Sequence, residues 1–386
     1  MSEKDAERIT HIITGLSQGG AEGALYKLIA ADSDPLRHSV VSLTDGGAYA
    51  KRLRALGVSV ECLNMNRVLP SPCPLLRLID LLAKSRPSVI QTWMYHADLL
   101  GGIAAKISRI PVCWGIRQGN ITIAVNSLRT WCIIKINGII SHFIPDIIVS
   151  CSRRAAEAHR SSLYKNRFAV IPNGIDLEQF ARRSPQRCAS LRRSLGIPSD
   201  ALVVGHLGRA DPQKDHRLLL EAFMTVAKAN HRAFLVLAGR GLTRESPYLC
   251  RLLGEGAECD RVVALGPRDD VVDLLSIMDV FALSSVGEAF PNVVIEAMSC
   301  GVPCIVTDVG DAAEIVGNTG WVCRPRDVSG FVDALFVALN ELHHIRIKRG
   351  EKARQRVIEN YSITRMFKAY NNIWKMTIKG DNICAV

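Results

Sequence analysis

The run VFALSSVGEAFPNVVIEAM, residues Val280–Met298, joins three local patterns. Its first four residues are apolar and include Val and Phe, which is typical of a buried strand. Gly287 and Pro291 then mark a turn, and Asn292 is placed to cap a helix that begins there. A short apolar strand followed directly by a helix is the repeating unit of a parallel sheet covered on both faces.

The same unit recurs along the whole chain. In the first half, short apolar runs lie at Thr10–Thr14, His38–Leu43, Val58–Leu63, Ser88–Thr92, Val112–Ile116 and Asp146–Ser150. In the second half they lie at Leu202–Leu207, Ala233–Ala238, Val262–Leu265, Val280–Leu283 and Pro303–Thr307. Helix-length segments separate these runs, among them Ala21–Ala30, Asp215–Ala229 and Asn292–Cys300. The pattern predicts an α/β protein with two Rossmann-like, doubly wound parallel sheets.

The length of 386 residues also fits two domains, at roughly 100–200 residues each. Between Val170 and Pro198, Gly, Pro and basic residues interrupt the pattern, as they do in turns and linkers. We therefore expect an N-terminal domain over 1–175 and a C-terminal domain over 176–360. The polar segment 361–386 is expected to form a helix that packs back towards the N-terminal domain.

Composition narrows the choice of partner and compartment. The net charge of +11 points to an anionic partner, which leaves nucleic acid, acidic lipid and phosphorylated metabolites open. The twelve Cys include no pair at metal-binding spacing, and an N-terminus without an apolar signal core favours a reducing cytosol. Charged residues and Pro145 interrupt the apolar stretch Trp131–Val149, so a spanning helix is not expected, although a segment lying on a membrane remains open.

Three loops carry candidate chemistry. Gly15–Glu22 ends a strand and opens a helix, so its amides could face an anion. Arg209 and Lys214 follow a strand end, where two cations can neutralise a diphosphate. Glu288 and Glu296 flank the start of the helix in the opening run. Glu296 lies among apolar residues, and a carboxylate there needs a polar partner such as sugar hydroxyls. Taken singly, each loop could also be structural.

Together these motifs resemble glycosyltransferase family 4, whose members are retaining enzymes of the GT-B fold, with two Rossmann-like domains facing each other across a cleft. The resemblance spans nearly the whole chain, in family order, and the set of motifs is specific where a single motif is not. The matching pieces are GLSQGGAE at 15–22, IPNGID at 171–176, Gly208-Arg-x4-Lys214, LAGRG at 237–241, the Glu288/Glu296 pair and GVPCIVTD at 301–308.

The resemblance implies roles for individual residues. Arg209 and Lys214 match the residues that bind the donor diphosphate, and Glu296 the one that binds the ribose. Glu288 matches the residue that contacts the transferred sugar, which makes it a catalytic candidate with Arg209 and Lys214. The remaining donor-site matches are Gly19 and Gly20, in a loop that approaches the diphosphate and the acceptor, Asn173 at the domain junction, Gly239, Arg240 and Arg268 near the base, and the backbone at Phe290, Asn292 and Val293 around the terminal phosphate.

The chain departs from the family in one place. Many members have a catalytic His after a first-domain strand, but the matching stretch here, Val112–Asn120, contains none. Arg117 or Asn120 could take its place, and His96 is a further candidate. No metal is expected, and the nucleotide sugar, with a UDP-sugar favoured over a GDP-sugar, is a substrate rather than a cofactor.

The expected acceptor is a lipid-linked saccharide or an oligosaccharide in bacterial surface polysaccharide or lipopolysaccharide assembly. The expected location is cytoplasmic, at the inner face of the cytoplasmic membrane, with basic residues of the first domain and the linker facing anionic lipid. The alternatives are another GT-B enzyme, such as a nucleotide-sugar epimerase or a phosphorylase, and a basic nucleic-acid-binding protein. No helix-turn-helix, zinc-finger or RNP-like pattern supports the last of these, so no specific nucleic acid is expected.

Overall fold

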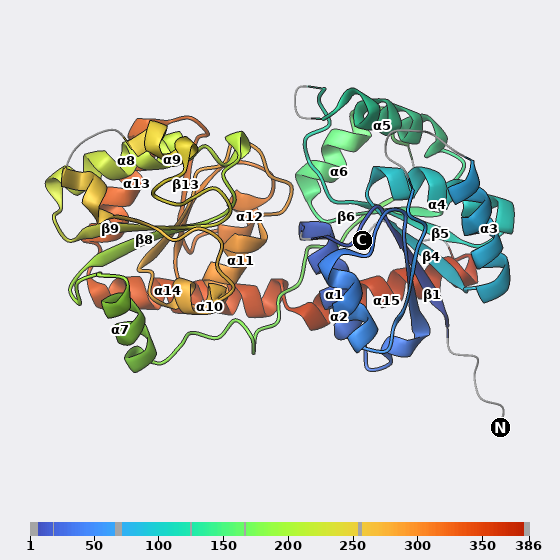
Figure 1. The fold of residues 1–386 in the computed structure, drawn as a ribbon, viewed down its shortest axis with the longest axis horizontal. Coiled ribbons are helices and arrows are strands. Elements are labelled where there is room, and N and C mark those ends of the chain that lie inside the picture. The colour runs from blue at the N-terminus through green and yellow to red at the C-terminus, as the bar shows by residue number, and fades with distance from the viewer. Residues whose placement is uncertain are drawn as a thin grey trace. The chain divides into compact units, whose positions relative to one another are not determined.

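The computed structural model describes residues 7–381 apart from 18, 66–71, 124–125, 166 and 254–256. The chain forms two compact units (Figure 1). Unit 1 comprises Met1–Gly174 and Ile363–Val386, and unit 2 comprises Ile175–Ser362. The C-terminal segment of the chain therefore belongs to the same unit as its N-terminal half.

Unit 1 is built on a parallel sheet, seven-stranded within the described residues, with the order β3-β2-β1-β4-β5-β6-β7. Its strands are β1 (Ile9–Ile13), β2 (His38–Ser42), β3 (Ser59–Cys62), β4 (Val89–Trp93), β5 (Val112–Ile116), β6 (Ile147–Ser150) and β7 (Phe168–Val170). Its helical segments are α1 (Gly20–Ala30), η1 (Pro35–Arg37), α2 (Gly47–Ala55), α3 (Cys73–Ser85), α4 (Tyr95–Ser108), α5 (Leu128–Ile140), α6 (Arg153–Arg160) and α15 (Ile363–Lys379).

Unit 2 repeats the plan with a parallel sheet, six-stranded in its described part, of order β10-β9-β8-β11-β12-β13. Its strands are β8 (Leu202–Leu207), β9 (Ala233–Ala238), β10 (Val262–Ala264), β11 (Val280–Leu283), β12 (Cys304–Thr307) and β13 (Trp321–Cys323). Its helical segments are α7 (Pro185–Ser194), η2 (Pro212–Lys214), α8 (His216–Ala229), α9 (Pro247–Leu253), η3 (Ala257–Arg261), α10 (Val271–Ser276), α11 (Asn292–Ser299), α12 (Ala312–Val316), α13 (Val328–Asn340) and α14 (His343–Asn360).

Strand order in both sheets runs outward in two directions from a central strand, β1 in unit 1 and β8 in unit 2. This doubly wound order places the loops after neighbouring strands at one edge of the sheet, where α/β proteins bind ligands. Each sheet has its own apolar core, formed by strand residues and the helices that cover them. The predicted fold class, two Rossmann-like parallel-sheet units, is confirmed.

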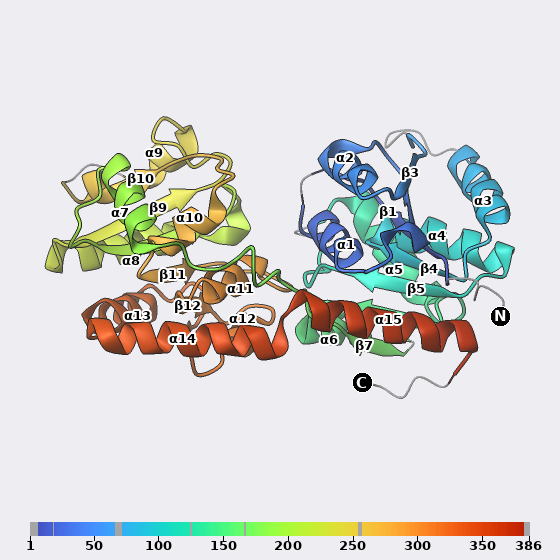
Figure 2. The same ribbon diagram turned by 90° about the horizontal axis from the view of Figure 1, so that it is seen from below.

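The last helix, α15, packs on the sheet of unit 1 next to α1 (Figure 2). Tyr370 and Trp374 are fully buried there. The Trp374 indole Nε1 donates to Gln91 Oε1 at 3.2 Å, and its ring meets those of His11 and His38 edge-on at 5.7 Å. The helix is thus held by buried aromatic packing, although its sequence is polar overall. No helix among the described residues is long and apolar enough to cross a bilayer.

Candidate functional site

The loops that follow β8 and β9 in unit 2 are built against each other. Gly208 N donates to Ala238 O at 2.9 Å, and Ala210 N donates to Arg240 O at 2.7 Å. Gly239 has φ +147°, and a Cβ there would lie 1.8 Å from Gly208 O. Only glycine fits such a position. The close approach aligns two strand-end loops at the carboxyl edge of the sheet.

Lys214 and Glu288 meet at this edge although 74 residues separate them. Lys214 Nζ lies 2.6 Å from Glu288 Oε1, and the two side chains are only 19% and 14% exposed. Ser285 Oγ also donates to Glu288 Oε1, at 2.8 Å. Ser284 Oγ donates to Lys214 O at 2.7 Å. The loop after β11 is therefore fixed to the loop after β8, and the pair presents one cation and one carboxylate.

Arg209 lies near the start of the same loop and is 66% exposed. Its Nε and NH2 both donate to Asp211 Oδ2, at 2.9 and 2.7 Å. Partial burial of Asp211 tends to raise its pKa, but the Gln213 amide and Arg209 outweigh that effect and lower it. Asp211 therefore stays ionised and holds an otherwise mobile guanidinium beside the Lys214 loop.

Two buried imidazoles lie behind this loop. His206 Nδ1 lies 2.9 Å from Ala282 O, and the rings of His206 and His216 meet edge-on at 4.8 Å. Burial, with a contribution from nearby Lys214, lowers the pKa of His206 to about 3 and that of His216 to about 4. Both rings are therefore neutral at pH 7 and add no charge behind Lys214.

The helix α11 starts at Asn292, with Pro291 as the N-cap. The prediction that Asn292 caps this helix is therefore wrong: Asn292 is the first helical residue, and no side chain caps the helix from the N-cap position. Phe290 is buried against the Tyr361 ring at 5.7 Å. Val293 and Glu296 are half-buried in the helix. The first turn of α11, where backbone amides are free of partners within the helix, begins four residues after Glu288.

Gly310 supports the same loop and was not anticipated from sequence. Its φ is +50°, and a Cβ there would lie 2.4 Å from Ala289 O. Asp311 N donates to Ala289 O at 3.0 Å. The turn after β12 therefore positions the backbone between Glu288 and α11. A single glycine in a turn does not indicate which distant backbone it contacts, so the sequence could not predict that Gly310 packs on Ala289.

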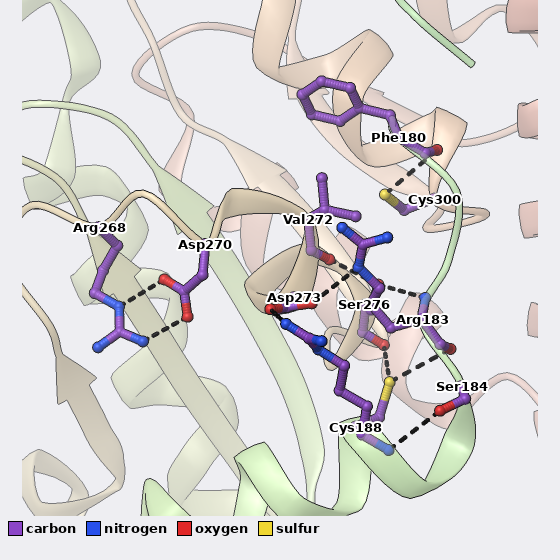
Figure 3. Close-up of polar contacts among 11 residues, drawn as sticks. Phe180, Arg183, Ser184, Cys188, Arg268, Asp270, Val272, Asp273, Ser276 and Cys300 are labelled. Carbon is purple, nitrogen blue, oxygen red and sulfur yellow. Dashed lines mark hydrogen bonds and ion pairs between the residues drawn. The ribbon is translucent and has the colours of Figure 1, made fainter. Parts of the chain in front are cut away.

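Two exposed arginines complete the predicted set in unit 2. Arg240 is exposed and enters the loop contact through its carbonyl. Arg268 forms a two-point contact with Asp270, with donor–acceptor distances of 2.7 and 2.5 Å (Figure 3). That contact lowers the pKa of Asp270. Arg268 is therefore held by a carboxylate of its own loop.

In unit 1, the predicted residues lie at strand ends but have different surroundings. Gly19 and Gly20 are exposed at the start of α1. The Glu22 carboxylate lies over Gly19, 2.3 Å from where a Cβ would be. Burial raises the pKa of Glu22. His96 is half-buried in the first turn of α4. Residue 18 of the predicted loop lies outside the described residues.

Arg117 holds together three separate segments of unit 1. Its NH1 donates to Asn173 Oδ1 at 2.6 Å, and its NH2 donates to the Tyr370 hydroxyl of α15. The guanidinium carbon also lies 4.3 Å from the Trp93 ring centroid. This geometry favours a positioning role for Arg117 and Asn173. Asn120 is used locally, because its Oδ1 accepts from the Thr122 amide and hydroxyl at 3.1 and 2.8 Å.

The basic linker has internal partners. Arg183 and Arg187 both reach Asp273 on α10, at 2.9 and 2.5 Å, and Figure 3 shows Arg183 directed at that carboxylate. Arg192 pairs with Asp279 at 3.0 Å. Much of the linker charge therefore fixes α7 to the rest of unit 2. No group of three or more His, Cys, Asp or Glu in the described residues could hold a metal ion.

The site combines a lysine–carboxylate pair with a nearby helix start at the carboxyl edge of a parallel sheet. Doubly wound α/β proteins bind ligands at that edge, and a helix start favours anions. Two family models match the chain: Glycosyltransferase Family 4 over residues 18–179 and Glycosyl transferases group 1 over residues 201–341. The chain is therefore a glycosyltransferase of the GT-B fold, with one domain that matches Glycosyltransferase Family 4 and one that matches Glycosyl transferases group 1.

Known proteins of this kind match at low identity. N-acetyl-alpha-D-glucosaminyl L-malate synthase of Bacillus anthracis is 29% identical over 61% of this chain and 61% of its own length. N,N'-diacetylbacillosaminyl-diphospho-undecaprenol alpha-1,3-N-acetylgalactosaminyltransferase of Campylobacter jejuni is 26% identical over 85% of this chain and 89% of its own. Anabaena HepE in complex with UDP superposes with a TM-score of 0.83 at 21% identity, over 95% of this chain and 99% of that one. HepE is also known with UDP-glucose.

Proposed function

We propose that the chain transfers a sugar from a UDP-sugar to a saccharide acceptor, with the donor diphosphate bound at the carboxyl edge of the unit 2 sheet. The observation that carries the proposal is the contact between Lys214 and Glu288, directly before the start of α11. A cation, a carboxylate and a helix N-terminus there match the three needs of a sugar diphosphate: charge neutralisation, hydroxyl contacts and amide donors.

The chemistry follows from where charge develops. As the bond between sugar and phosphate breaks, negative charge grows on the diphosphate and positive charge on the sugar. Lys214, Arg209 and the first amides of α11 stabilise the leaving group. Glu288 contacts the transferred sugar. Because Lys214 and Arg209 supply the positive charge, transfer proceeds without a metal and the enzyme needs no cofactor.

The rest of the donor binds along the same edge of unit 2. Glu296 accepts hydrogen bonds from the ribose hydroxyls. The loop at Gly239 and Arg240, with Arg268 nearby, contacts the base. The backbone from Phe290 to Val293 holds the terminal phosphate, and the buried Phe290 ring keeps that backbone rigid.

Unit 1 binds the acceptor. Gly19 and Gly20 at the start of α1 let the acceptor approach the backbone. His96 is the remaining titratable candidate for contact with the reacting sugar. Arg117 positions Asn173 and α15 and orders the end of β5, which the distances to Asn173 and Trp93 support. The sugar is transferred with retention of its anomeric configuration.

The choice of UDP rests on the UDP and UDP-glucose bound in HepE. The acceptor is a lipid-linked saccharide of bacterial surface polysaccharide or lipopolysaccharide assembly. Support comes from the Campylobacter jejuni relative, whose name describes transfer to a diphospho-undecaprenol-linked sugar. The enzyme works at the cytoplasmic face of the membrane. The free thiols of all eleven cysteines in the described residues are compatible with that reducing compartment.

Thermal unfolding with UDP-, GDP-, ADP- and CDP-sugars, each with and without EDTA, tests the proposal. A ligand that binds only the folded chain stabilises it by RT ln(1 + [L]/Kd), so the shift reports affinity. We expect a selective shift with UDP-sugars that EDTA does not change. A shift that requires a divalent cation would contradict the metal-free donor site, and selective GDP-sugar binding would contradict the choice of UDP.

A further inference from the structure

Helix α5 packs into unit 1 through one face and carries exposed apolar side chains on another. Its inner face packs through the buried residues Ile134, Asn137 and Gly138. A surface helix normally turns polar side chains outward. The outer face of α5 instead carries Leu128, Ile136 and Ile139, which are 64%, 44% and 59% exposed. Packing within unit 1 thus leaves an apolar face of α5 uncovered.

The exposed residues form one continuous stripe. Leu128, Cys132, Ile136, Ile139 and Phe143 follow one another at steps of four, four, three and four residues, which is the repeat of one helix face. Phe143 lies in the turn that continues α5, where its amide donates to Ile140 O at 3.1 Å, and it is 74% exposed. We call these five residues the outer face of α5.

The charged residues of α5 itself have one sign. The sequence contains no Asp or Glu between Asp98 and Asp146. Arg129 and Lys135 lie on α5 itself, and Lys135 Nζ is 5.5 Å from the Trp131 ring centroid. Exposed aliphatic and aromatic side chains flanked by cations and tryptophan are the composition of helices that lie in the headgroup region of anionic bilayers.

The face also begins near the predicted acceptor end of unit 1. Leu128 follows the loop after β5, so the stripe starts at the carboxyl edge of the sheet, the edge that also holds Arg117 and the start of α1. Figure 1 shows α5 running over α4 beside α6 within unit 1. A bilayer in contact with this face would lie next to that edge.

We propose that the outer face of α5 docks the protein on an anionic lipid bilayer, with the apolar stripe entering the headgroup boundary and Arg129 and Lys135 at the phosphates. The inference rests on the proposed function for its purpose, the delivery of a lipid-linked acceptor. A second copy of the chain is a poorer occupant. Two such faces in contact would bring Arg129 and Lys135 of both copies together without an acidic residue from either face.

Flotation with phosphatidylcholine vesicles, with and without one-fifth phosphatidylglycerol, tests the docking. We expect the wild type to bind the anionic vesicles preferentially and to lose that preference as salt is raised. Ile139→Ser combined with Phe143→Ser is expected to weaken binding at least about tenfold, because two large side chains no longer leave water. Leu36→Ser, an aliphatic residue of η1 that is 71% exposed, is the matched control and should bind as the wild type does.

UDP-sugar binding of the double variant is measured in parallel and should be unchanged, which shows that unit 2 is folded and separates this proposal from the previous one. If the wild type bound vesicles but no nucleotide sugar, the result would support docking through α5 and contradict the proposed UDP-sugar donor. Equal vesicle binding by wild type and double variant would overturn the docking. So would a wild-type dimer that the double variant dissociates, because the face would then belong to a second copy.

Discussion

Replacing Lys214 by Ala separates the structural and functional parts of the site. In the donor-free protein the change leaves the Glu288 carboxylate, which is 14% exposed, without its cation. Breaking a fully buried pair costs about 3–5 kcal/mol. Because Ser285 still donates to Glu288 and the pair is partly solvated, we expect a loss of about 1–3 kcal/mol. For a unit of this size that lowers Tm by several degrees, at about 2–4 °C per kcal/mol.

The same substitution acts on donor binding through a different contact. A hydrogen bond from an ammonium to a phosphate oxygen contributes about 1.5–3 kcal/mol, so Kd for UDP should rise about 10- to 150-fold. Titration calorimetry measures this directly. Arg217→Ala, which removes an exposed cation at the start of α8, is the matched control and should leave UDP binding unchanged.

A second substitution distinguishes the two effects. Adding Glu288→Gln to Lys214→Ala removes the unpaired carboxylate, so the melting temperature should partly recover. UDP affinity should stay low, because the cation is still missing. If Lys214→Ala bound UDP as tightly as the wild type, or if the double variant recovered affinity together with stability, Lys214 would be only a structural partner of Glu288.

Three further substitutions have outcomes that the structure predicts. Glu296→Ala should lower kcat/KM for the nucleotide sugar by about 100-fold or more while the circular dichroism spectrum stays native; near-normal turnover would remove Glu296 from the donor site. Gly239→Ala should lower Tm and UDP affinity together, because a Cβ would lie 1.8 Å from Gly208 O. Unchanged Tm and affinity would mean that the loops after β8 and β9 can separate at little cost. Burial raises the pKa of Asp98 to about 7. Folding then retains a proton that the unfolded chain releases above pH 3.8, so this contribution to stability is lost as pH rises towards and through 7. The stabilisation that Asp98→Asn gives should therefore be larger at pH 8 than at pH 5, by about 2–3 kcal/mol; parallel Tm–pH curves for variant and wild type would contradict that assignment.

Much of the fold could be predicted because local pattern and tertiary role agree. The strands over Leu202–Leu207 and Val280–Leu283 were predicted to the residue. Each is an apolar run that ends at a polar or glycine-containing loop, and burial on both faces requires that composition. The spacing of Lys214 and Glu288 from these strands then placed both side chains at one sheet edge.

The remainder depends on contacts between distant residues. The sequence predicts a linker where helix α7 forms, because the segment is basic and has no apolar face. Ion pairs to Asp273 and Asp279 hold the helix in place. Helix α15 buries Tyr370 and Trp374, but its sequence is polar overall, so the sequence did not predict an aromatic buried face. Arg117 is a catalytic candidate because the matching stretch lacks the family's His, and the sequence could not show its bond to the Tyr370 hydroxyl, 253 residues away.

Hydrogen–deuterium exchange of the wild-type chain with and without UDP tests the location of the donor site most directly, since it needs no substitution and no acceptor. The account predicts slower exchange at the amides of Gly208–Lys214 and of Ser284–Glu296, and unchanged exchange along α5. Protection confined to unit 1, or none at either segment under saturating UDP, would contradict a donor site at the Lys214–Glu288 pair.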